Sequence, residues 1–240
     1  MYRKMFAILV FILCMSIIVI AAEGYNPAYQ INAVAGSTPN IDGVIASGEW
    51  DDASTVSFNN TLVYVKQDGR NLYVAFNASD STVNMQDAVA IFIDVENNGG
   101  ASPQPDDFLF GILRGGQLME RQGNNPSGPP TGGWNASASS TSTLWQVEFN
   151  ITYAKIAITP GEAKTLGIAF ESWNYDIGYP YFWPPMTPME SNSPSNWGNL
   201  ISEVNWIPEF PSGMFLSLFM TVSLLAVVFA RSKIPRKQKI

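Results

Sequence analysis

Short apolar segments separated by turns constrain the fold of this chain more than any other feature of its sequence. The dipeptide Asp68-Gly69 joins residues 62–66 to residues 72–77, and such a turn between alternating segments predicts a β-hairpin. Helical periodicity is sustained only at the two ends of the chain. We therefore predict an all-β fold, an antiparallel β-sandwich of the immunoglobulin-like or jelly-roll type. The predicted strands are residues 62–66, 72–77, 88–95, 107–113, 117–121, 144–151, 166–173 and 199–206.

The first 22 residues have the order of a secretory signal peptide. Arg3 and Lys4 precede a continuous apolar run at residues 5–20, and two alanines follow before Glu23. We predict a signal helix that is cleaved after residue 22. The alternative is an N-terminal anchor that is retained.

Residues 213–230 form a second apolar run, without a charged side chain. As a helix with a rise of ~1.5 Å per residue, this run nearly spans a hydrocarbon core of ~30 Å. The tail at residues 231–240 is basic and contains no acid, which places it in the cytoplasm by the positive-inside rule. The sequence thus predicts an extracellular domain at residues 23–206, a linker at 207–212, and a single transmembrane helix in the cell membrane.

The exported part of the chain is strongly acidic. Of the 13 Lys and Arg residues, two lie in the signal peptide and five in the tail. Residues 23–212 therefore carry six basic and all 20 acidic side chains, a net charge of −14. Such a surface repels nucleic acids and anionic lipids, and we exclude both as partners.

The residue types that most catalytic sites require are absent from the predicted mature domain. The chain contains no His, and its one cysteine, Cys14, lies in the signal peptide. Serine and cysteine nucleophiles activated by His are excluded, as are His-ligated zinc sites. Paired carboxylates that hydrolyse glycosides remain possible, but no pair is distinguished by its context. We predict that the protein is not an enzyme.

Oxygen-bearing side chains follow the apolar segment at residues 88–95. Calcium prefers about 6–8 oxygen ligands from carboxylates, amides and carbonyls. The candidate ligands are Asp94, Glu96, Asn98, Asp106 and Asp107. The alternative is a solvated acidic turn beside a second acidic loop.

Aromatic residues gather around the long loop at residues 175–195. Sugar rings stack on indole and phenol rings while polar groups bind their hydroxyls. The candidate ligand-binding residues are Glu171, Trp173, Tyr175, Asp176, Tyr181 and Trp183. The alternative is that these rings cap the core. We expect core positions for Trp50, Trp145 and Trp197, and a membrane-interface position for Trp206.

Four Asn-x-Ser/Thr sequons are candidate N-glycosylation sites on an exported surface. Their acceptors are Asn59, Asn77, Asn135 and Asn150.

Several motifs, in this order, resemble family 9 carbohydrate-binding modules and their DOMON-type relatives across residues 31–204. They are Ile41-Asp42-Gly43-Val44, Glu49-Trp50-Asp51-Asp52-Ala53, the hairpin at 63–77, the acid-ended strand at 91–99, Asp106-Asp107-Phe108, Trp145-Gln146-Val147-Glu148 and Ser195-Asn196-Trp197-Gly198. The resemblance implies a β-sandwich with structural calcium in comparable loops. Relatives of this kind bind sugars, bind haem, or serve as surface modules of unknown role.

The tripeptide Pro208-Glu209-Phe210 precedes the second apolar run and resembles the PEF-CTERM sorting signal of archaeal surface proteins. That resemblance implies removal of the C-terminal helix by a sorting protease. The alternative is an ordinary linker followed by a retained helix.

These observations favour a membrane-anchored, calcium-stabilised module at the cell surface that binds a polysaccharide or a cell-surface glycan. One alternative is a haem-binding electron-transfer module. Its axial ligands would come from Met85, Met119, Met186 and Met189 together with Lys66, Lys155 or Lys164. Another is a surface-layer or adhesion component without a small ligand.

Overall fold

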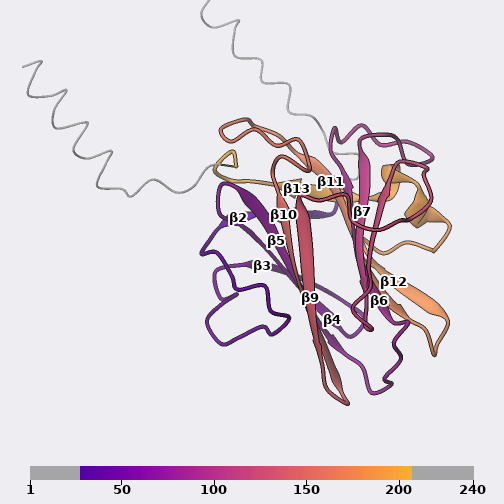
Figure 1. Cartoon of the computed structure of the whole chain (residues 1–240). Coiled ribbons are helices and arrows are strands. Elements are labelled where there is room, and N and C mark those ends of the chain that lie inside the picture. The colour runs from indigo at the N-terminus through magenta and orange to yellow at the C-terminus, as the bar shows by residue number, and fades with distance from the viewer. Residues whose placement is uncertain (1–27, 207–240) are drawn as a thin grey trace, which may run out of the picture.

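The computed structural model describes residues 28–206, which form two β-sheets packed face to face (Figure 1). Seven strands form sheet A, in the order β1-β13-β11-β6-β7-β8 with β12 paired to β11. Six strands form sheet B, in the order β2-β4-β5-β10-β9 with β3 paired to β4. The strands are β1 Gln30–Asn32, β2 Val34–Ala35, β3 Ser54–Phe58, β4 Thr61–Gln67, β5 Asn71–Ser79, β6 Ala88–Asp94, β7 Asp107–Leu113, β8 Leu118–Gln122, β9 Trp134–Ser140, β10 Leu144–Thr152, β11 Leu166–Asn174, β12 Tyr179–Trp183 and β13 Gly198–Ile201. Two short 3-10 turns, η1 Glu190–Asn192 and η2 Pro194–Asn196, lie between β12 and β13.

The predicted β-sandwich is confirmed, but its sheets are mixed rather than wholly antiparallel. The N-terminal segment contributes β1 to the edge of sheet A and β2 to sheet B, and both pair in parallel with their neighbours. The segment that carries β1 and β2 crosses from sheet A to sheet B and is not part of a hairpin. Hairpin geometry therefore does not force these two strands to run antiparallel to their neighbours. All other paired strands are antiparallel.

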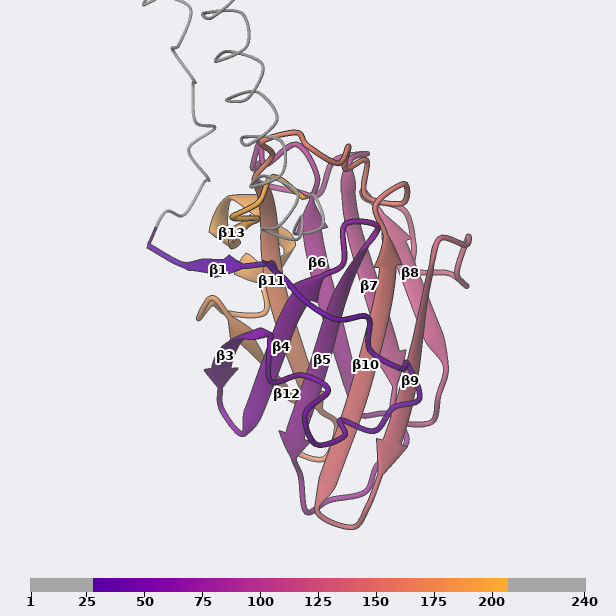
Figure 2. The ribbon, with the colours of Figure 1, turned by 90° about the vertical axis from the view of Figure 1, so that its left-hand side faces the viewer.

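Alternating side chains of the two sheets meet in one apolar core. Figure 2 looks onto sheet B, with sheet A behind it. Phe76 of β5 lies 5.7 Å from Phe149 of β10 and 5.8 Å from Phe170 of β11, between ring centroids. All three rings are fully buried, and each contributes about 1.5–3 kcal/mol relative to an exposed position. This core fixes the register of both sheets, because a slip of one residue would turn every inner side chain outward.

Glu148 holds the segment before β3 against the outer face of sheet B. It is fully buried and accepts hydrogen bonds from Trp50 Nε1 at 2.8 Å and from the Gly43 amide at 2.8 Å. Gly43 has φ +89°, and a Cβ there would lie 2.5 Å from the carbonyl carbon of Ala138. This position therefore requires glycine. The motifs at residues 41–44 and 49–53 are thus structural, and Trp50 is buried as predicted.

Trp206 corrects one prediction. It is fully buried, meets Tyr153 edge to face at 5.7 Å, and donates from Nε1 to the Lys164 carbonyl at 2.7 Å. The predicted position of Trp206 at a membrane interface is therefore wrong, because its ring packs in the core.

The signal peptide predicted at residues 1–22 and the transmembrane helix predicted at 213–230 lie outside the described residues. Within residues 28–206 no helix has the length and hydropathy that a membrane crossing requires.

Candidate functional site

The predicted aromatic set is divided between the core and one end of the sandwich. Trp183 is 8% exposed and stacks on Phe170 at 5.6 Å. It packs in the core, which agrees with the alternative that this ring caps the core. Trp173 and Tyr181, by contrast, line a pocket.

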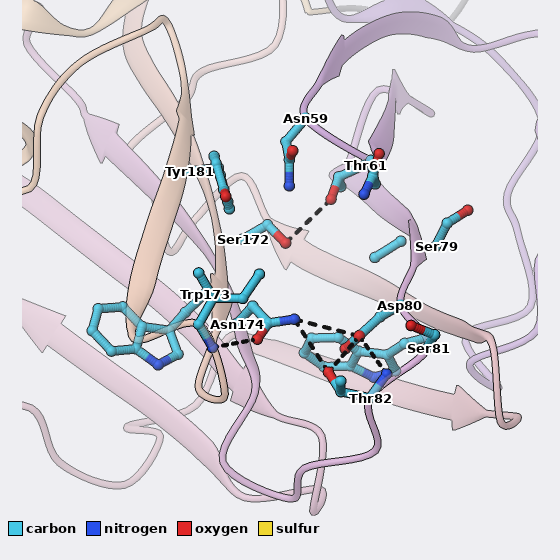
Figure 3. A pocket seen from close by; sticks show the side chains of 14 residues that line it. Asn59, Thr61, Ser79, Asp80, Ser81, Thr82, Ser172, Trp173, Asn174 and Tyr181 are labelled. Carbon is cyan, nitrogen blue, oxygen red and sulfur yellow. Dashed lines mark hydrogen bonds between the residues drawn. The ribbon is translucent and has the colours of Figure 1, made fainter.

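This pocket, the end pocket, has a volume of about 170 Å³ and lies where the β3–β4 turn meets the ends of β5 and β11 (Figure 3). Its lining is mostly hydroxyl, amide and carboxylate groups, with three aromatic residues. The lining residues used below are Asn59, Thr61, Asp80, Thr82, Trp145, Ser172, Trp173, Asn174, Ile177 and Tyr181. Many closely spaced hydrogen-bonding groups in a small concave site suit a polar, hydroxyl-bearing ligand.

Trp145 supplies an unpaired donor to the end pocket. It is 2% exposed, as expected for a core tryptophan, and the guanidinium carbon of Arg114 lies 5.8 Å from its ring centroid. Yet its buried Nε1 has no hydrogen-bond partner. A buried N–H without an acceptor is unfavourable, so an oxygen atom in the pocket would stabilise it.

Arg114, which directly follows β7, connects the segments that meet at this end of the sandwich. Its Nη1 donates to Asp80 at 2.9 Å and to Asp87 at 3.2 Å. Burial raises the pKa of Asp80, but hydrogen bonds from Thr82 and the charge of Arg114 outweigh burial, and the net pKa is lowered. Asp80 therefore stays ionised, and it accepts a hydrogen bond from Asn174 Nδ2 at 3.3 Å.

Exposed apolar side chains gather in the segments that adjoin the end pocket in sequence. Five of the seven exposed large hydrophobic residues among the described residues come from the β5–β6 loop, the β11–β12 loop and the start of β12: Val83, Met85, Tyr175, Ile177 and Tyr179. The loops are joined by a hydrogen bond from Asn84 Nδ2 to Asp176 Oδ1 at 3.2 Å. Asp176, predicted to bind ligand, thus connects loops, whereas Tyr175 belongs to the exposed rim.

The acidic cluster, defined as Asp94, Asp106 and Asp107, brings three of the five predicted metal ligands together. One carboxylate oxygen from each lies within 4.8 Å of the others. Antiparallel pairing places Asp94 at the end of β6 directly opposite Asp107 at the start of β7. Asp107 is 1% exposed, and its Oδ1 has no hydrogen-bond partner.

Electrostatics make this cluster unfavourable without a cation. Burial raises the pKa of Asp107 to about 7, and the charges of Asp94 and Asp106 add to the shift although the Gln104 amide opposes it. The remaining candidates lie less directly in the cluster. Glu96 pairs with Lys164 at 3.1 Å, and Asn98 Nδ2 donates to Asp106 at 3.4 Å. Hard carboxylate oxygens with one unpaired buried atom suit calcium.

Glu171 lies apart from the end pocket. Its carboxyl group accepts no hydrogen bond from any residue in the range 28–206, and its neighbour in β11, Ser172, points to the opposite face of sheet A. Burial raises the pKa of Glu171 to about 7, and the charge of Arg121 opposes this shift.

The raised pKa of Glu171 predicts a stability change with pH. Between about pH 4.5 and 7 the unfolded chain releases this proton while the folded chain keeps it, so the free energy of unfolding falls as pH rises. We expect the Glu171→Gln variant to match wild type near pH 4 and to exceed its stability by about 1–2 kcal/mol at pH 8. Urea unfolding at both pH values measures the difference. A Glu162→Gln control, at an exposed position, should show no such change, and an equal difference at both pH values would contradict the prediction.

The four sequons differ in accessibility. Asn59 and Asn135 are exposed, whereas Asn77 in β5 and Asn150 in β10 are partly buried, and the Oδ1 atoms of the last two are buried without a partner. We expect the native protein to carry N-glycans at Asn59 or Asn135 and none at the two mid-strand positions. Mass spectrometry of peptides measures site occupancy, and a glycan on Asn77 or Asn150 would contradict this expectation.

The lysines considered as haem ligands are held in ion pairs. Lys66 is fully buried and contacts Asp52 at 2.8 Å, Lys155 contacts Glu120 at 2.7 Å, and Lys164 contacts Glu96 at 3.1 Å. Axial ligation would require breaking one of these pairs. The contacts therefore do not favour the haem alternative.

Comparisons with known proteins find the same fold in solved structures. No family model matches the sequence, and no curated protein matches it. A carbohydrate-binding module of family 9 from Caldicellulosiruptor kristjanssonii, in complex with cellotriose, is similar over 76% of this chain and 95% of its own, with a TM-score of 0.57 and 17% identity. A second structure of such a module from the same organism, in complex with glucose, covers 73% and 96% of the two chains, with a TM-score of 0.56 and 18% identity. A structure from Bacteroides uniformis ATCC 8492 has a TM-score of 0.51 at 14% identity and covers 73% and 98% of the two chains. These likenesses identify the fold as a β-sandwich like that of carbohydrate-binding modules.

Proposed function

We propose that this protein is a non-enzymatic carbohydrate-binding module displayed on the cell surface, and that the end pocket holds a sugar residue of a polysaccharide or cell-surface glycan. One observation carries the proposal: Trp145, whose buried Nε1 has no partner, lines a pocket rich in hydroxyl and amide groups. A sugar hydroxyl would accept from this N–H. The exposed rim at Tyr175 and Ile177 offers apolar surface for the C–H faces of neighbouring rings.

The same fold in modules crystallised with cellotriose and glucose supports a neutral sugar as the ligand. The negative net charge of the exported domain also favours a neutral ligand. The six basic and 20 acidic side chains of residues 23–212 disfavour anionic glycans.

Calcium forms a second part of the proposal. Asp94, Asp106 and Asp107 would hold the ion, and Asn98, whose Nδ2 donates to Asp106, lies beside them. The ion would neutralise three crowded carboxylates and join the β6–β7 connection to the sandwich. It would stabilise the domain without taking part in chemistry.

The apolar runs and the basic tail support membrane anchoring of the module. In this arrangement residues 1–22 direct export, residues 213–230 span the membrane, and the sandwich faces the exterior. Processing at residues 208–210 would release the sandwich from this helix.

Calorimetry tests the function directly. The full chain is purified in a detergent without a sugar headgroup, because a glucoside or maltoside would compete for the site. Cellotriose and glucose are then titrated into the protein with calcium present. We expect saturable binding of cellotriose, and heats of dilution alone for both sugars would refute the proposal as it concerns this ligand class.

A further inference from the structure

One of the four sequons lies in the wall of the end pocket. Asn59 and Asn60 form the two-residue turn between β3 and β4, and Thr61, which completes the sequon, is the first residue of β4. Asn59 and Thr61 both line the pocket, and Figure 3 shows the Asn59 side chain extending from the turn toward the other lining residues. A glycan attached to Asn59 would therefore begin at the edge of this cavity.

The amide of Asn59 is available for modification. The residue is exposed, and its side chain makes no hydrogen bond to any residue in the range 28–206. Its φ of 47° lies in the left-handed region, which asparagine accepts more readily than most residues. A glycan on its Nδ2 would break no contact of the native pocket, because the hydrogen bond from Thr61 Oγ1 to Ser172 Oγ at 3.1 Å does not involve Asn59.

The other three sequons lack this combination of exposure and position. Asn77 and Asn150 are partly buried within strands, and their Oδ1 atoms are buried. Asn135 is exposed on β9 but does not line the end pocket. Asn59 is thus the acceptor, among the four, from which a glycan would reach the pocket, and Asn135 offers a matched control.

A sugar tethered to Asn59 would compete with any free glycan for the end pocket. Attachment through a short flexible link gives an effective concentration on the order of mM, so even a weakly bound sugar stays close to its site. A hydroxyl of that sugar would accept a hydrogen bond from Trp145 Nε1, which has no partner in the described part of the chain. Because the cavity measures only about 170 Å³, a pocket covered in this way would leave little room for a second sugar.

We propose that Asn59 is an N-glycosylation site whose glycan covers the end pocket and so regulates the access of other glycans to it. The transfer forms a bond from Asn59 Nδ2 to C1 of the sugar and breaks the bond from C1 to the phosphate of a lipid-linked donor. The amide gives up one proton, and the lipid phosphate leaves with the electron pair of the broken bond. The regulatory role rests on the proposed function for its ligand class, whereas the covering of the pocket does not.

A comparison of two preparations of the full chain tests this proposal. One comes from a host that attaches N-glycans to exported proteins and the other from a host that does not, and both carry 15N-tryptophan in a detergent without a sugar headgroup. We expect mass spectrometry to find a glycan on Asn59 in the first preparation alone. In nuclear magnetic resonance spectra, the indole resonance of Trp145, assigned with Trp145→Phe, should differ between the preparations. Calorimetry should give an affinity for cellotriose at least about tenfold weaker in the glycosylated protein.

Two variants attribute these differences to one glycan. Asn59→Gly removes the acceptor, and glycine adopts positive φ without strain, so the turn is retained. Made in the two hosts, this variant should show the same Trp145 resonance and the same affinity. Asn135→Gln removes the other exposed acceptor and should preserve both differences seen in wild type.

The remaining outcomes separate this inference from the proposed function. An Asn59 that stays unmodified in the glycosylating host, or a Trp145 resonance that is the same in both wild-type preparations, would overturn the inference. Differences that persist in Asn59→Gly, or an affinity for cellotriose that is equal in the two wild-type preparations, would overturn it as well. If neither preparation binds cellotriose but the Trp145 resonance still depends on the Asn59 glycan, the glycan covers the pocket as inferred and the proposed sugar ligand is refuted.

Discussion

Calcium is expected to raise the melting temperature of the full chain by about 5–10 °C relative to protein stripped with EDTA. At a calcium concentration 100 times the dissociation constant, binding to the folded state alone adds about 2.7 kcal/mol. For a domain of this size each kcal/mol corresponds to about 2–4 °C. The physical reason is the crowding of Asp94, Asp106 and Asp107 within 4.8 Å, with a buried Asp107 oxygen that has no other partner. Differential scanning calorimetry with and without the ion measures the shift.

The Asp107→Asn variant makes this prediction specific to the acidic cluster. It removes one of three mutually repelling carboxylates, so in EDTA we expect it to be as stable as wild type or more stable. It should also lose most of the calcium-induced shift. Asp51→Asn, at an exposed position outside the cluster, should keep the full shift. An undiminished calcium response in Asp107→Asn would show that calcium stabilises the protein at another place.

The acidic cluster was predictable because it depends on local chain geometry. Residues 88–95 and 107–113 are consecutive strands, and consecutive strands commonly pair, which brings the end of one to the start of the next. The observed pairing of Asp94 with Asp107 is this arrangement. The position of Glu96 depends instead on Lys164, 68 residues away, and no local pattern indicated that contact.

Strands with small or few inner side chains were missed. In β9, Trp134–Ser140, the inner residues Trp134, Ala136 and Ala138 alternate with Asn and Ser, but two of the three are alanines, so the apolar signal is weak although the strand pairs with β10 along seven residues. β1 and β2 are three and two residues long and lie at sheet edges, where backbone hydrogen bonds rather than side chains define them. The hairpin strands, by contrast, were predicted because their inner side chains form the core.

The candidate site was predicted less well than the fold, because the sequence does not show which end or face of the sandwich an aromatic ring occupies. Trp183 was assigned to a ligand platform and lies in the core, against Phe170. Trp145 was assigned to the core, and it is buried there, but it also lines the end pocket, and its indole nitrogen has no partner. Burial and ligand contact are compatible for an amphipathic side chain, and only the partners of its N–H distinguish the two roles.

The Ser172→Leu variant is expected to abolish sugar binding at the end pocket while leaving the domain folded. Ser172 lines a cavity of only about 170 Å³, so a leucine side chain would occupy space that the sugar ring needs. The hydrogen bond from Thr61 Oγ1 to Ser172 Oγ, 3.1 Å long, would be lost at a cost of about 1 kcal/mol. Burial of the leucine would offset that cost. We expect the affinity of the end pocket for cellotriose, followed by the shift of the Trp145 indole resonance, to fall at least about a hundredfold, which is about 2.8 kcal/mol.

Two further variants decide what such a loss means. Ser57→Leu makes the same substitution at an exposed position of β3 that does not line the pocket, and it should bind like wild type. Trp145→Phe keeps an aromatic ring but removes the unpaired N–H, and we expect about tenfold weaker binding of cellotriose because one hydrogen bond to the sugar is lost. Calorimetry measures this affinity, since the variant lacks the indole resonance. If Ser172→Leu and Trp145→Phe both bind cellotriose like wild type, the end pocket is not the sugar site. Any binding that persists in those variants would then be assigned to another part of the domain.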